Sequence, residues 1–476
     1  MYLQQVLNGV ACTRVGNGNY DITGLSCDTS TVTQGCLFFC LRGKRTDGHD
    51  FARKAVGDGA VALVVERPLD IEAAQFVVED TRAAMALCAK NFYERAADKM
   101  KIVLVSGTNG KTSTTYLLDA IFTRAGYRTG VIGTNGVFFG GKRHDSTLTT
   151  PDPIALHKWL WQMYVNKVQI VFAEASAHAI ALRKLHGVHA ETSVFTNFGR
   201  DHLDYFETMD NYKAVKKSLF CPQYTTNAVV NIDDPVGREI TSQMGCITYS
   251  VDGDGDVTAR DVAVDRDGTT FRAECFGRQA VVRTNLSGRF NVYNALAALT
   301  VAEIHGVDLA TSVAALEEVR TIDGRNQTFY GTGGMRVVVD FAHTPDGIDN
   351  ILSYLRQTTQ GKLIVVFGCG GNRDRFKRPL MAAAVSMYAD FAVLTSDNPR
   401  YEEPSQIAHD AASGLTCPYK VMLNRQSATE YAFGMATDND TVAVLGKGAE
   451  TYQEIKGKRI YYSDVDVVTR LLRPRE

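Results

Sequence analysis

The sequence has few cysteines, few prolines and no long apolar run. It contains 10 cysteines and 11 prolines in 476 residues, and no two cysteines have the Cys-x-x-Cys spacing that is typical of a zinc site. The cysteines stand singly, which excludes a disulfide scaffold. No stretch reaches 18 apolar residues, and the opening residues MYLQQVLNGV lack the basic and apolar segments of a signal peptide. We therefore predict a cytoplasmic protein with reduced thiols and no membrane segment.

An excess of charge of one sign is also absent. The sequence has 51 Lys and Arg against 53 Asp and Glu, which gives a formal net charge of −2. This balance provides no general attraction to nucleic acid or to an anionic membrane, so neither is predicted as a partner. Apolar residues make up 45% of the chain, which is enough to build the cores of two to four domains.

Three stretches of the chain differ in pattern, and we predict one domain in each, at residues 1–98, 99–326 and 327–476. Short apolar runs alternate with helical stretches, which is typical of an α/β fold with parallel strands. Residues 251–283, rich in Asp, Gly, Val and Thr, predict an antiparallel insert. The other expected elements are helices at 81–98 and from 114 to about 125, and strands at 61–65, 101–106, 169–173, 193–196, 228–230, 335–340, 362–367, 391–394 and 441–445.

The strongest local signal is a glycine-rich loop between a predicted strand and a predicted helix. Such a loop turns its backbone N–H groups toward an anion, and the start of the helix adds favourable partial charge. Lys111 supplies a cation for the outer phosphates of a nucleotide, and the hydroxyl of Thr112 suits Mg²⁺. Val105 stands where the usual pattern has its first glycine. The loop consists of Gly107, Thr108, Asn109, Gly110, Lys111, Thr112 and Ser113, and we predict that it binds a nucleotide.

Carboxylates and an imidazole follow two further predicted strands. Glu174 comes directly after one strand, and His202 lies in the segment Asp201-His202-Leu203-Asp204 after another. Ligand-binding loops leave the carboxyl ends of the strands in an open parallel sheet, so Glu174 and His202 are candidate ligands of a cation shared with phosphate. The alternative is that these residues only cap helices or complete local hydrogen bonds, and this alternative is favoured for Asp204.

The ends of three predicted strands in the last domain carry complementary charges. Arg373 follows one strand, Asn398 and Arg400 follow the next, and Glu450 follows a third. Guanidinium groups bind carboxylates through two parallel hydrogen bonds, and a glutamate can receive an ammonium. The set therefore predicts a site for a zwitterion such as an amino acid. Surface turns are the alternative, because Asn-Pro and Gly-Gly pairs commonly form them.

Taken together, the motifs resemble the Mur ligase family over nearly the whole chain and in the order of the family. The resemblance rests on residues 47–50, 107–112, 148–152, 195–197, 201–205, 288–294, 340–345, 397–400 and 446–448. It implies a three-domain architecture: an N-terminal domain for the UDP moiety, a central P-loop ATPase domain with a parallel sheet, and a C-terminal Rossmann-like domain. It also implies an enzyme that forms an amide bond through an acyl phosphate made from ATP, and we expect this enzyme to be a monomer.

Within this family, the chain is most similar to the members that add meso-diaminopimelate to UDP-N-acetylmuramoyl-L-alanyl-D-glutamate. The resemblance implies that Lys111, Glu174, His202 and Lys216 are catalytic. Lys216 matches a lysine that carries a carbamate (N6-carboxylysine), and Thr112, Glu174, His202 and the modified Lys216 would be the Mg²⁺ ligands. The other implied contacts are Asn291, Asn294, Arg325, Asp340 and His343 for ATP, Thr149, Thr150, Ser176 and Lys184 for the muramoyl dipeptide, and Arg373, Asp397, Asn398, Pro399, Arg400, Gly446 and Glu450 for diaminopimelate.

Several positions depart from the family pattern. Thr29 and Ser30 replace Ser-Arg near the start of the chain, Leu182 and Lys184 stand where Gln and Arg often contact the dipeptide, and Ala449 replaces a histidine. Three hypotheses therefore stay open: the diaminopimelate ligase, the same chemistry with L-lysine or another carboxylate acceptor, and a nucleotide-binding protein without catalysis. Arg400 favours diaminopimelate over lysine, because only diaminopimelate has a distal carboxylate for a cation to bind.

Overall fold

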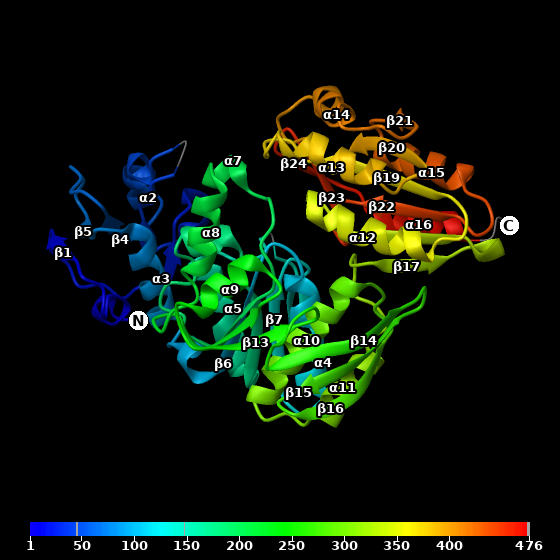
Figure 1. The fold of residues 1–476 in the computed structure, drawn as a ribbon. Helices are drawn as coiled ribbons and strands as arrows, with labels where there is room; N and C mark the ends of the chain where they lie inside the picture. The colour runs from blue at the N-terminus through cyan, green and yellow to red at the C-terminus, as the bar shows by residue number, and fades with distance from the viewer. Residues whose placement is uncertain (44–45, 147, 474–476) are drawn as a thin grey trace. The chain divides into compact units, whose positions relative to one another are not determined.

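The computed structural model describes residues 1–43, 46–146 and 148–473 (Figure 1). The chain divides into two compact units. Three elements contribute residues to both units: β11 (Ala190–Phe195), α8 (Met209–Lys217) and β12 (Thr225–Asn231). Unit 1 comprises Met1–Ser106, Tyr127–Ser193 and Val215–Ala228, and unit 2 comprises Gly107–Gly126, Val194–Ala214 and Val229–Glu476.

Unit 1 contains a five-stranded sheet built from the first 77 residues. Its order is β1-β5-β4-β3-β2, and all pairs except β1 with β5 are parallel. Alternate residues of β3 and β4 enter separate apolar clusters, so both faces of these central strands are buried, as expected for parallel strands. The elements are α1 (Leu3–Val6), β1 (Thr13–Val15), β2 (Gly24–Ser26), β3 (Cys36–Phe39), α2 (Ala52–Gly57), β4 (Ala60–Val65), β5 (Ala74–Val77) and α3 (Thr81–Phe92).

The rest of unit 1 contains strands in the order β6-β10-β7-β8-β9. The strands β6, β10 and β7 are parallel, and β8 and β9 continue the sheet as antiparallel strands. Glu174 is the last residue of β10 and pairs in register with Val105 of β6. The elements are β6 (Lys101–Ser106), β7 (Thr129–Gly133), β8 (Gly136–Phe139), β9 (Lys142–His144), α5 (Pro153–Val165), β10 (Ile170–Glu174) and α6 (Ala177–Ala181).

Unit 2 places α4, the helix after the glycine-rich loop, against α10 and α11. The helix α10 also covers β13, β14 and β15, and α11 contacts β16. The strands β14, β15 and β16 pair antiparallel, which confirms the predicted insert. The elements are α4 (Lys111–Arg124), α7 (Leu203–Phe206), α9 (Pro235–Thr241), β13 (Cys246–Ser250), β14 (Val257–Val264), β15 (Thr269–Cys275), β16 (Arg278–Thr284), α10 (Arg289–Ile304) and α11 (Leu309–Glu318).

The last part of unit 2 is a six-stranded sheet with helices on both faces. Its order is β17-β18-β22-β19-β20-β21, and only β17 is antiparallel to its neighbour. The helices α12, α13 and α14 share one apolar cluster with the sheet, and α15 and α16 share another. The strands are β17 (Gln327–Tyr330), β18 (Arg336–Asp340), β19 (Leu363–Cys369), β20 (Phe391–Ser396), β21 (Tyr419–Val421) and β22 (Thr441–Leu445), with the hairpin β23 (Tyr452–Ile455) and β24 (Lys458–Tyr461); the helices are α12 (Pro345–Thr358), α13 (Lys377–Ser386), α14 (Pro404–Ala412), α15 (Arg425–Met435) and α16 (Asp464–Leu472).

The predicted α/β class with parallel strands is confirmed, but two helix boundaries differ from the prediction. The helix expected to reach residue 98 ends at Phe92, because Glu94 and Arg95 adopt positive φ angles of 57° and 54° that no α-helix continues through. A short 3₁₀ helix at Ala96–Lys99 follows. The helix expected from residue 114 begins at Lys111, three residues earlier.

Candidate functional site

The glycine-rich loop requires its glycines for steric reasons. Gly107 and Gly110 have φ angles of 148° and 87°. A Cβ atom on Gly107 would lie 1.8 Å from Oγ1 of Thr196, and one on Gly110 would lie 2.5 Å from Oδ1 of Asn294. Only glycine fits either position, because the side chains of Thr196 and Asn294 pack directly against the backbone of this loop before α4 begins.

Side chains from the segment after β11 fix the loop from the other side. The backbone N–H of Asn109 donates to Oδ1 of Asn197 at 2.9 Å, and the hydroxyl of Thr196 donates to the carbonyl of Asn109 at 2.6 Å. The ammonium of Lys111 donates to the carbonyls of Gly107 and Thr108 at 2.9 and 2.8 Å, so it is centred over the loop. This position suits the phosphate-binding role predicted for Lys111.

The predicted ATP residues Asn291 and Asn294 lie on α10 and are buried. Nδ2 of Asn294 donates to Oδ1 of Asn291 at 3.0 Å, and Nδ2 of Asn291 donates to the carbonyl of Ser287 at 2.9 Å. The hydroxyl of Thr114 on α4 donates to Asn294 at 3.4 Å. The pair therefore contacts α4, the helix that follows the glycine-rich loop.

Arg325 connects the glycine-rich loop to the six-stranded sheet. Its Nη2 donates to the hydroxyl of Thr112 at 2.8 Å, and its guanidinium lies 4.4 Å from the ring centre of Phe341. Asp340, at the end of β18, accepts from the backbone N–H groups of Asn326 and Ala342 at 2.6 and 2.7 Å. Burial raises the pKa of Asp340 above its ordinary value. Arg325, Asp340 and Thr112 thus occur in one connected region of unit 2.

His202 and His343 lie beside the carboxylate of Asp201. Oδ2 of Asp201 is 3.2 Å from Nε2 of His202 and 3.7 Å from Nε2 of His343. Oδ1 of Asp201 accepts from the ammonium of Lys377 at 2.9 Å. Burial alone would raise the pKa of Asp201, but Lys377 and the two histidines outweigh burial and hold the pKa well below its ordinary value. Burial lowers the pKa of His343 to about 4, so its imidazole is neutral at pH 7.

The loops after β19, β20 and β22 meet around Asn398, as their strand-end positions predict. Oδ1 of Asn398 accepts from the ammonium of Lys447 at 3.1 Å, and its Nδ2 donates to Oε2 of Glu450 at 3.0 Å. Lys447 also donates to Oε2 of Glu450 at 2.8 Å. Lys447 is fully buried, and sequence reasoning assigned it no role although it lies between Gly446 and Gly448.

Asp397 and Gly446, which are next to Asn398 and Lys447 in the sequence, lie close together. Gly446 has a φ angle of 115°, and a Cβ atom there would lie 2.7 Å from Oδ2 of Asp397. Burial would raise the pKa of Asp397, but the charges of Lys447 and Arg425 outweigh burial and lower it. Asp397 therefore balances buried cations, which is a role beyond the ligand contact predicted from the motif.

Arg373 and Arg400 both lie close to Gly370. A Cβ atom on Gly370 would be 3.6 Å from Cγ of Arg373 and 3.1 Å from Nη1 of Arg400. Burial and the neighbouring Arg400 lower the pKa of Arg373. Nη1 of Arg400 donates to the carbonyl of Gly371 at 2.9 Å, and its Nε lies 3.2 Å from Oε2 of Glu454. Two adjacent guanidinium groups form a natural receptor for carboxylates.

Unit 1 holds the residues predicted to bind the muramoyl dipeptide, together with Glu174. The hydroxyl of Thr150 donates to the carbonyl of Glu174 at 2.7 Å and to Oγ of Ser176 at 3.2 Å. The ammonium of Lys184 donates to the carbonyl of Thr150 at 2.9 Å, and burial lowers the pKa of Lys184. Thr149 joins the group through a 3.1 Å hydroxyl contact with Thr134.

Thr134 is a residue that sequence reasoning missed. Its backbone N–H donates to Oε1 of Glu174 at 2.8 Å, and its hydroxyl donates to Oε2 at 3.1 Å. Its position directly after β7, which pairs in parallel with β10, was an available signal.

Lys216 lies near the end of α8 and is 1% exposed.

Ligands suited to Mg²⁺ are present in both units. Glu174 offers a carboxylate, Thr112 a hydroxyl and His202 an imidazole. No group of three His, Cys, Asp or Glu side chains within residues 1–43, 46–146 and 148–473 is arranged to hold a metal ion alone. Because Mg²⁺ commonly takes few protein ligands and completes its shell with water and nucleotide phosphates, a hydroxyl such as that of Thr112, directly after a glycine-rich loop, is a group that fits a metal bound together with a nucleotide.

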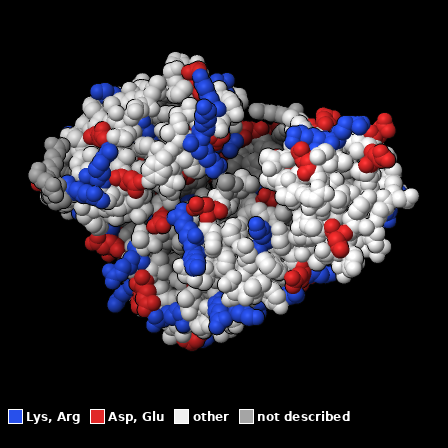
Figure 2. Space-filling view, turned by 180° about the vertical axis from the view of Figure 1, so that it is seen from behind, with Lys and Arg blue, Asp and Glu red and all other residues white. Residues whose placement is uncertain are grey.

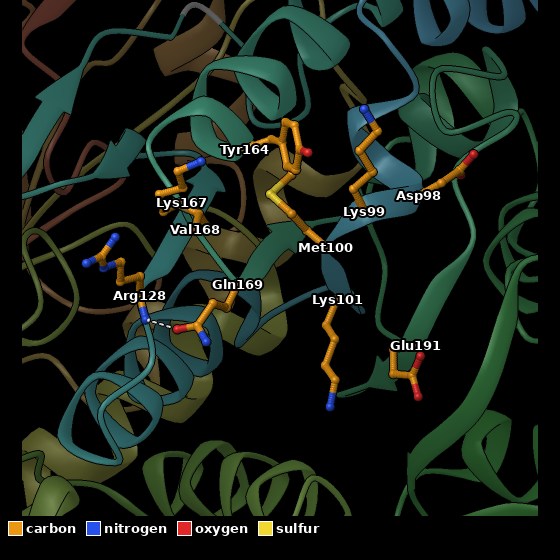
Figure 3. A pocket seen from close by; sticks show the side chains of 10 residues that line it. All are labelled: Asp98, Lys99, Met100, Lys101, Arg128, Tyr164, Lys167, Val168, Gln169 and Glu191. Carbon is orange, nitrogen blue, oxygen red and sulfur yellow. Dashed lines mark hydrogen bonds between the residues drawn. The ribbon is translucent and has the colours of Figure 1, made fainter.

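A separate hollow lies in unit 1, at the amino ends of β6 and β10. Its lining includes Lys99, Lys101 and Gln169, and it encloses about 890 Å³. Figure 3 shows that the side chains of Lys99 and Lys101 point in opposite directions. Glu174 lies at the other end of β10, where ligands of parallel sheets bind. We assign the hollow no part in the candidate site.

The surface of the molecule carries charged side chains of both signs (Figure 2). In the face shown in Figure 2, basic and acidic side chains are interspersed, and no extended basic area is visible. Across the described chain, every helix is too short or too polar to cross a membrane.

Comparison with known proteins gives consistent matches along the chain. Residues 21–107 match the model "Mur ligase family, catalytic domain", residues 105–302 the "Mur ligase middle domain", and residues 324–448 the "Mur ligase, glutamate ligase domain". The chain is 40% identical over 473 residues to the UDP-N-acetylmuramoyl-L-alanyl-D-glutamate--2,6-diaminopimelate ligase of Geobacillus thermodenitrificans, covering 96% of both proteins. It is 39% identical to the ligase of that name from Aquifex aeolicus, covering 95% of this chain and 94% of that one.

Solved structures give the same picture. The chain is similar to a structure of a UDP-N-acetylmuramoyl-L-alanyl-D-glutamate--2,6-diaminopimelate ligase, with 32% identity, a TM-score of 0.67 and coverage of 95% of this chain and 94% of that chain. A ligase of Thermotoga maritima solved in complex with ADP has a TM-score of 0.64 over 90% of this chain and 94% of that chain. At 19% identity, this second likeness supports the fold alone.

Proposed function

Because the chain belongs to the Mur ligase family, we propose that it joins meso-diaminopimelate to UDP-N-acetylmuramoyl-L-alanyl-D-glutamate in peptidoglycan synthesis, with ATP converted to ADP and phosphate. The names of its relatives support these substrates. The observation that carries the proposal is the group in unit 2 where Arg373 and Arg400 both lie close to Gly370 and Glu450 lies beside Asn398. Such a group offers cations to carboxylates and an anion to an ammonium, which matches an amino acid with several charges.

The chemistry needs two steps, because a carboxylate is a poor electrophile. In the first step, the carboxylate of the muramoyl dipeptide attacks the γ-phosphorus of ATP, and ADP leaves. In the second step, the amine of diaminopimelate attacks the acyl carbon. The bond between that carbon and the phosphate oxygen breaks, and phosphate leaves. Lys111 offsets the negative charge that would otherwise repel the attacking carboxylate.

Each unit contributes residues to a different part of this reaction. We assign Thr149, Thr150, Ser176 and Lys184 to the muramoyl dipeptide, and the residues of the glycine-rich loop to ATP. The connected group of Arg325, Asp340 and Thr112 supports the nucleotide end. The amino acid belongs to the strand-end loops around Asn398.

Magnesium belongs to the proposal as the companion of ATP. Thr112, Glu174, His202 and a carbamate on Lys216 would be its ligands, and the metal supplies charge neutralisation at the phosphates. Lys216 is 1% exposed, and a carbamate would turn this lysine into an anion that can bind a cation. We also propose that the chain acts as a monomer in the cytoplasm, with domains at 1–98, 99–326 and 327–476.

L-Lysine is the second candidate for the amino acid. It has the reacting amine but no distal carboxylate. Arg400 argues against lysine, because a guanidinium held at this place by Gly371 and Glu454 is suited to a second carboxylate.

The test measures ADP and the new amide together, with the purified chain, ATP and Mg²⁺. We expect ADP release that depends on both UDP-N-acetylmuramoyl-L-alanyl-D-glutamate and meso-diaminopimelate, with one amide formed for each ADP. Equal turnover with L-lysine would reject the selectivity for diaminopimelate. Absence of ADP with every acceptor would reject the ligase and favour a nucleotide-binding protein without catalysis.

Lys216 provides a separate prediction. Lys216→Ala should abolish ligation, and a small carboxylic acid such as acetate should restore part of it, because the acid replaces the missing carbamate. Lys217→Ala is the matched control on the same helix and should stay active. Full activity of Lys216→Ala without any acid would contradict the carbamate assignment.

A further inference from the structure

Two short segments of unit 2 are joined by ion pairs. One segment, residues 200–204, follows β11 and contains His202. The other, residues 373–377, follows β19 and leads into α13. Both segments carry side chains of both charge signs. The pairs are Arg200 with Asp374 at 3.1 Å, Asp201 with Lys377 at 2.9 Å, and Asp204 with Arg373 at 3.8 Å.

The central pair differs from the other two in its burial. The side chains of Asp201 and Lys377 are each 6% exposed, whereas those of Arg200 and Arg373 are 33% and 43% exposed. A buried ion pair rarely stabilises a fold more than apolar residues of similar volume would, because both charges lose their hydration. Its contribution is to fix the positions of the two side chains, because separating them would leave each buried charge without its partner.

The carboxylate of Asp201 also orients the residue beside it. Oδ1 accepts from the backbone N–H of His202 at 2.9 Å as well as from Lys377, and Oδ2 faces Nε2 of His202 at 3.2 Å. On the other segment, Lys377 follows Arg373 by four residues in a tight loop. The pair therefore ties the segment of a proposed magnesium ligand to the segment of a proposed amino-acid ligand.

We propose that the Asp201–Lys377 pair is a positioning element that holds these two segments in register, so that the amine reaches the acyl phosphate before water does. This inference rests on the proposed function. Neither residue is assigned to touch the reacting atoms. Asp204, for which capping was the favoured interpretation, belongs to the same set of pairs through Arg373.

Loss of register has a defined chemical consequence. When the amine is misplaced, water can attack the acyl carbon instead. The oxygen of water bonds to that carbon, the bond to phosphate breaks, and phosphate leaves with the original carboxylate regenerated and a proton released. The net result is hydrolysis of ATP without a new amide, so the ratio of ADP to amide rises above one.

The experiment compares this ratio in Lys377→Met, Lys377→Arg and the wild type. Lys377→Met removes the charge, and we expect a ratio of at least three with a KM for ATP within twofold of the wild type. Lys377→Arg keeps the charge, and we expect a ratio close to one. Arg356→Met, which removes an exposed ion pair with Asp390 elsewhere on the same sheet, is the control and should also keep a ratio of one.

A second variant covers the case in which Lys377→Met does not fold. Asp201→Asn keeps an oxygen that can accept from His202 but loses the charge that binds Lys377, and the same rise in the ratio is expected. A purely structural role would lower ADP and amide together and leave the ratio at one, which would overturn the proposal. If the wild type itself forms neither product, the proposed function fails instead, so the two failures are distinguishable.

Discussion

Arg400 shows how a single predicted residue depends on partners that the motif does not contain. Its backbone lies in the left-handed region at a φ angle of 52°. Its backbone N–H donates to the carbonyl of Glu454 at 2.9 Å, and its carbonyl accepts from the N–H of Lys456 at 2.7 Å. The hairpin of β23 and β24 thus holds the backbone of Arg400, and the carboxylate of Glu454 additionally contacts Nε of its guanidinium.

Arg400→Ala should raise the KM for meso-diaminopimelate and leave the KM for ATP unchanged. Loss of a charged hydrogen-bonding group costs about 1.5–3 kcal/mol, which corresponds to roughly 10- to 150-fold. Glu454→Gln should give a smaller rise, because the arginine stays but loses a charged partner. Steady-state kinetics with each substrate varied measures both effects.

The control for this prediction is Arg470→Ala, which removes an exposed guanidinium paired with Glu430 on the helices behind the sheet. Its kinetics should match those of the wild type. An Arg400→Ala variant that discriminates against lysine as well as the wild type does would show that Arg400 does not read the distal carboxylate.

At the scale of elements, the chemistry of the chain lies where parallel strands end and helices begin. Candidate residues lie at or directly after the carboxyl ends of β10, β18, β19, β20 and β22. The glycine-rich loop adds a second feature, because it must pass between Thr196 and Asn294 before α4 begins.

Gly110→Ala should weaken nucleotide binding, and Gly126→Ala is its matched control. Both glycines have nearly the same φ angle, 87° and 88°. A Cβ atom on Gly110 would lie 2.5 Å from Asn294, whereas one on Gly126 has no atom within 4 Å. Gly126→Ala should cost about 1–2 kcal/mol in the free energy of unfolding, because alanine is strained in this conformation, and Gly110→Ala should cost more, because its Cβ also meets Asn294.

Only Gly110→Ala should raise the dissociation constant for ADP, by at least tenfold. Calorimetric titration with ADP and Mg²⁺ measures binding, and urea unfolding measures stability. Equal ADP affinity in the two variants would show that the close contact with Asn294 is not the reason for a glycine at position 110.

At the scale of the whole molecule, the acid sensitivity of the fold has an identifiable source in unit 1. His157 on α5 is 1% exposed, and burial lowers its pKa from an ordinary value of 6.5 to about 3. The unfolded chain therefore binds a proton that the folded chain refuses. The stability contributed by the neutral imidazole is complete above pH 6.5 and is lost as the pH falls from 6.5 toward 3.

His157→Leu should make unfolding less sensitive to acid. Between pH 7 and pH 4.5, we expect the free energy of unfolding of the wild type, measured with urea, to fall by more than that of the variant. The difference between the two falls should be on the order of 2 kcal/mol. His409→Gln, at an exposed position on α14, is the control and should follow the wild type. Parallel curves for the wild type and His157→Leu would exclude this histidine as the source.

The sequence could predict the features that depend on neighbours along the chain. A strand, a glycine-rich turn and a helix follow one another between Lys101 and Arg124, and this order alone predicted a phosphate loop. Apolar runs located the strands in the same way, because a buried parallel strand is apolar on both faces. Helix ends were less predictable, since the positive φ angles of Glu94 and Arg95 have no sequence signature.

Only the tertiary structure decided which distant residues meet. Lys377 and Asp201 are 176 residues apart, Asn109 and Asn197 are 88 apart, and Glu454 reaches Arg400 only through a hairpin. Periodicity and motif spacing record the environment of one segment, so they contain no information about a partner on another. The sequence by itself determined the class of fold and the family, and it predicted the phosphate loop. The pairing of charges across the strand ends was decided by how the sheets and their loops pack, because a buried charge selects its partner by distance in space.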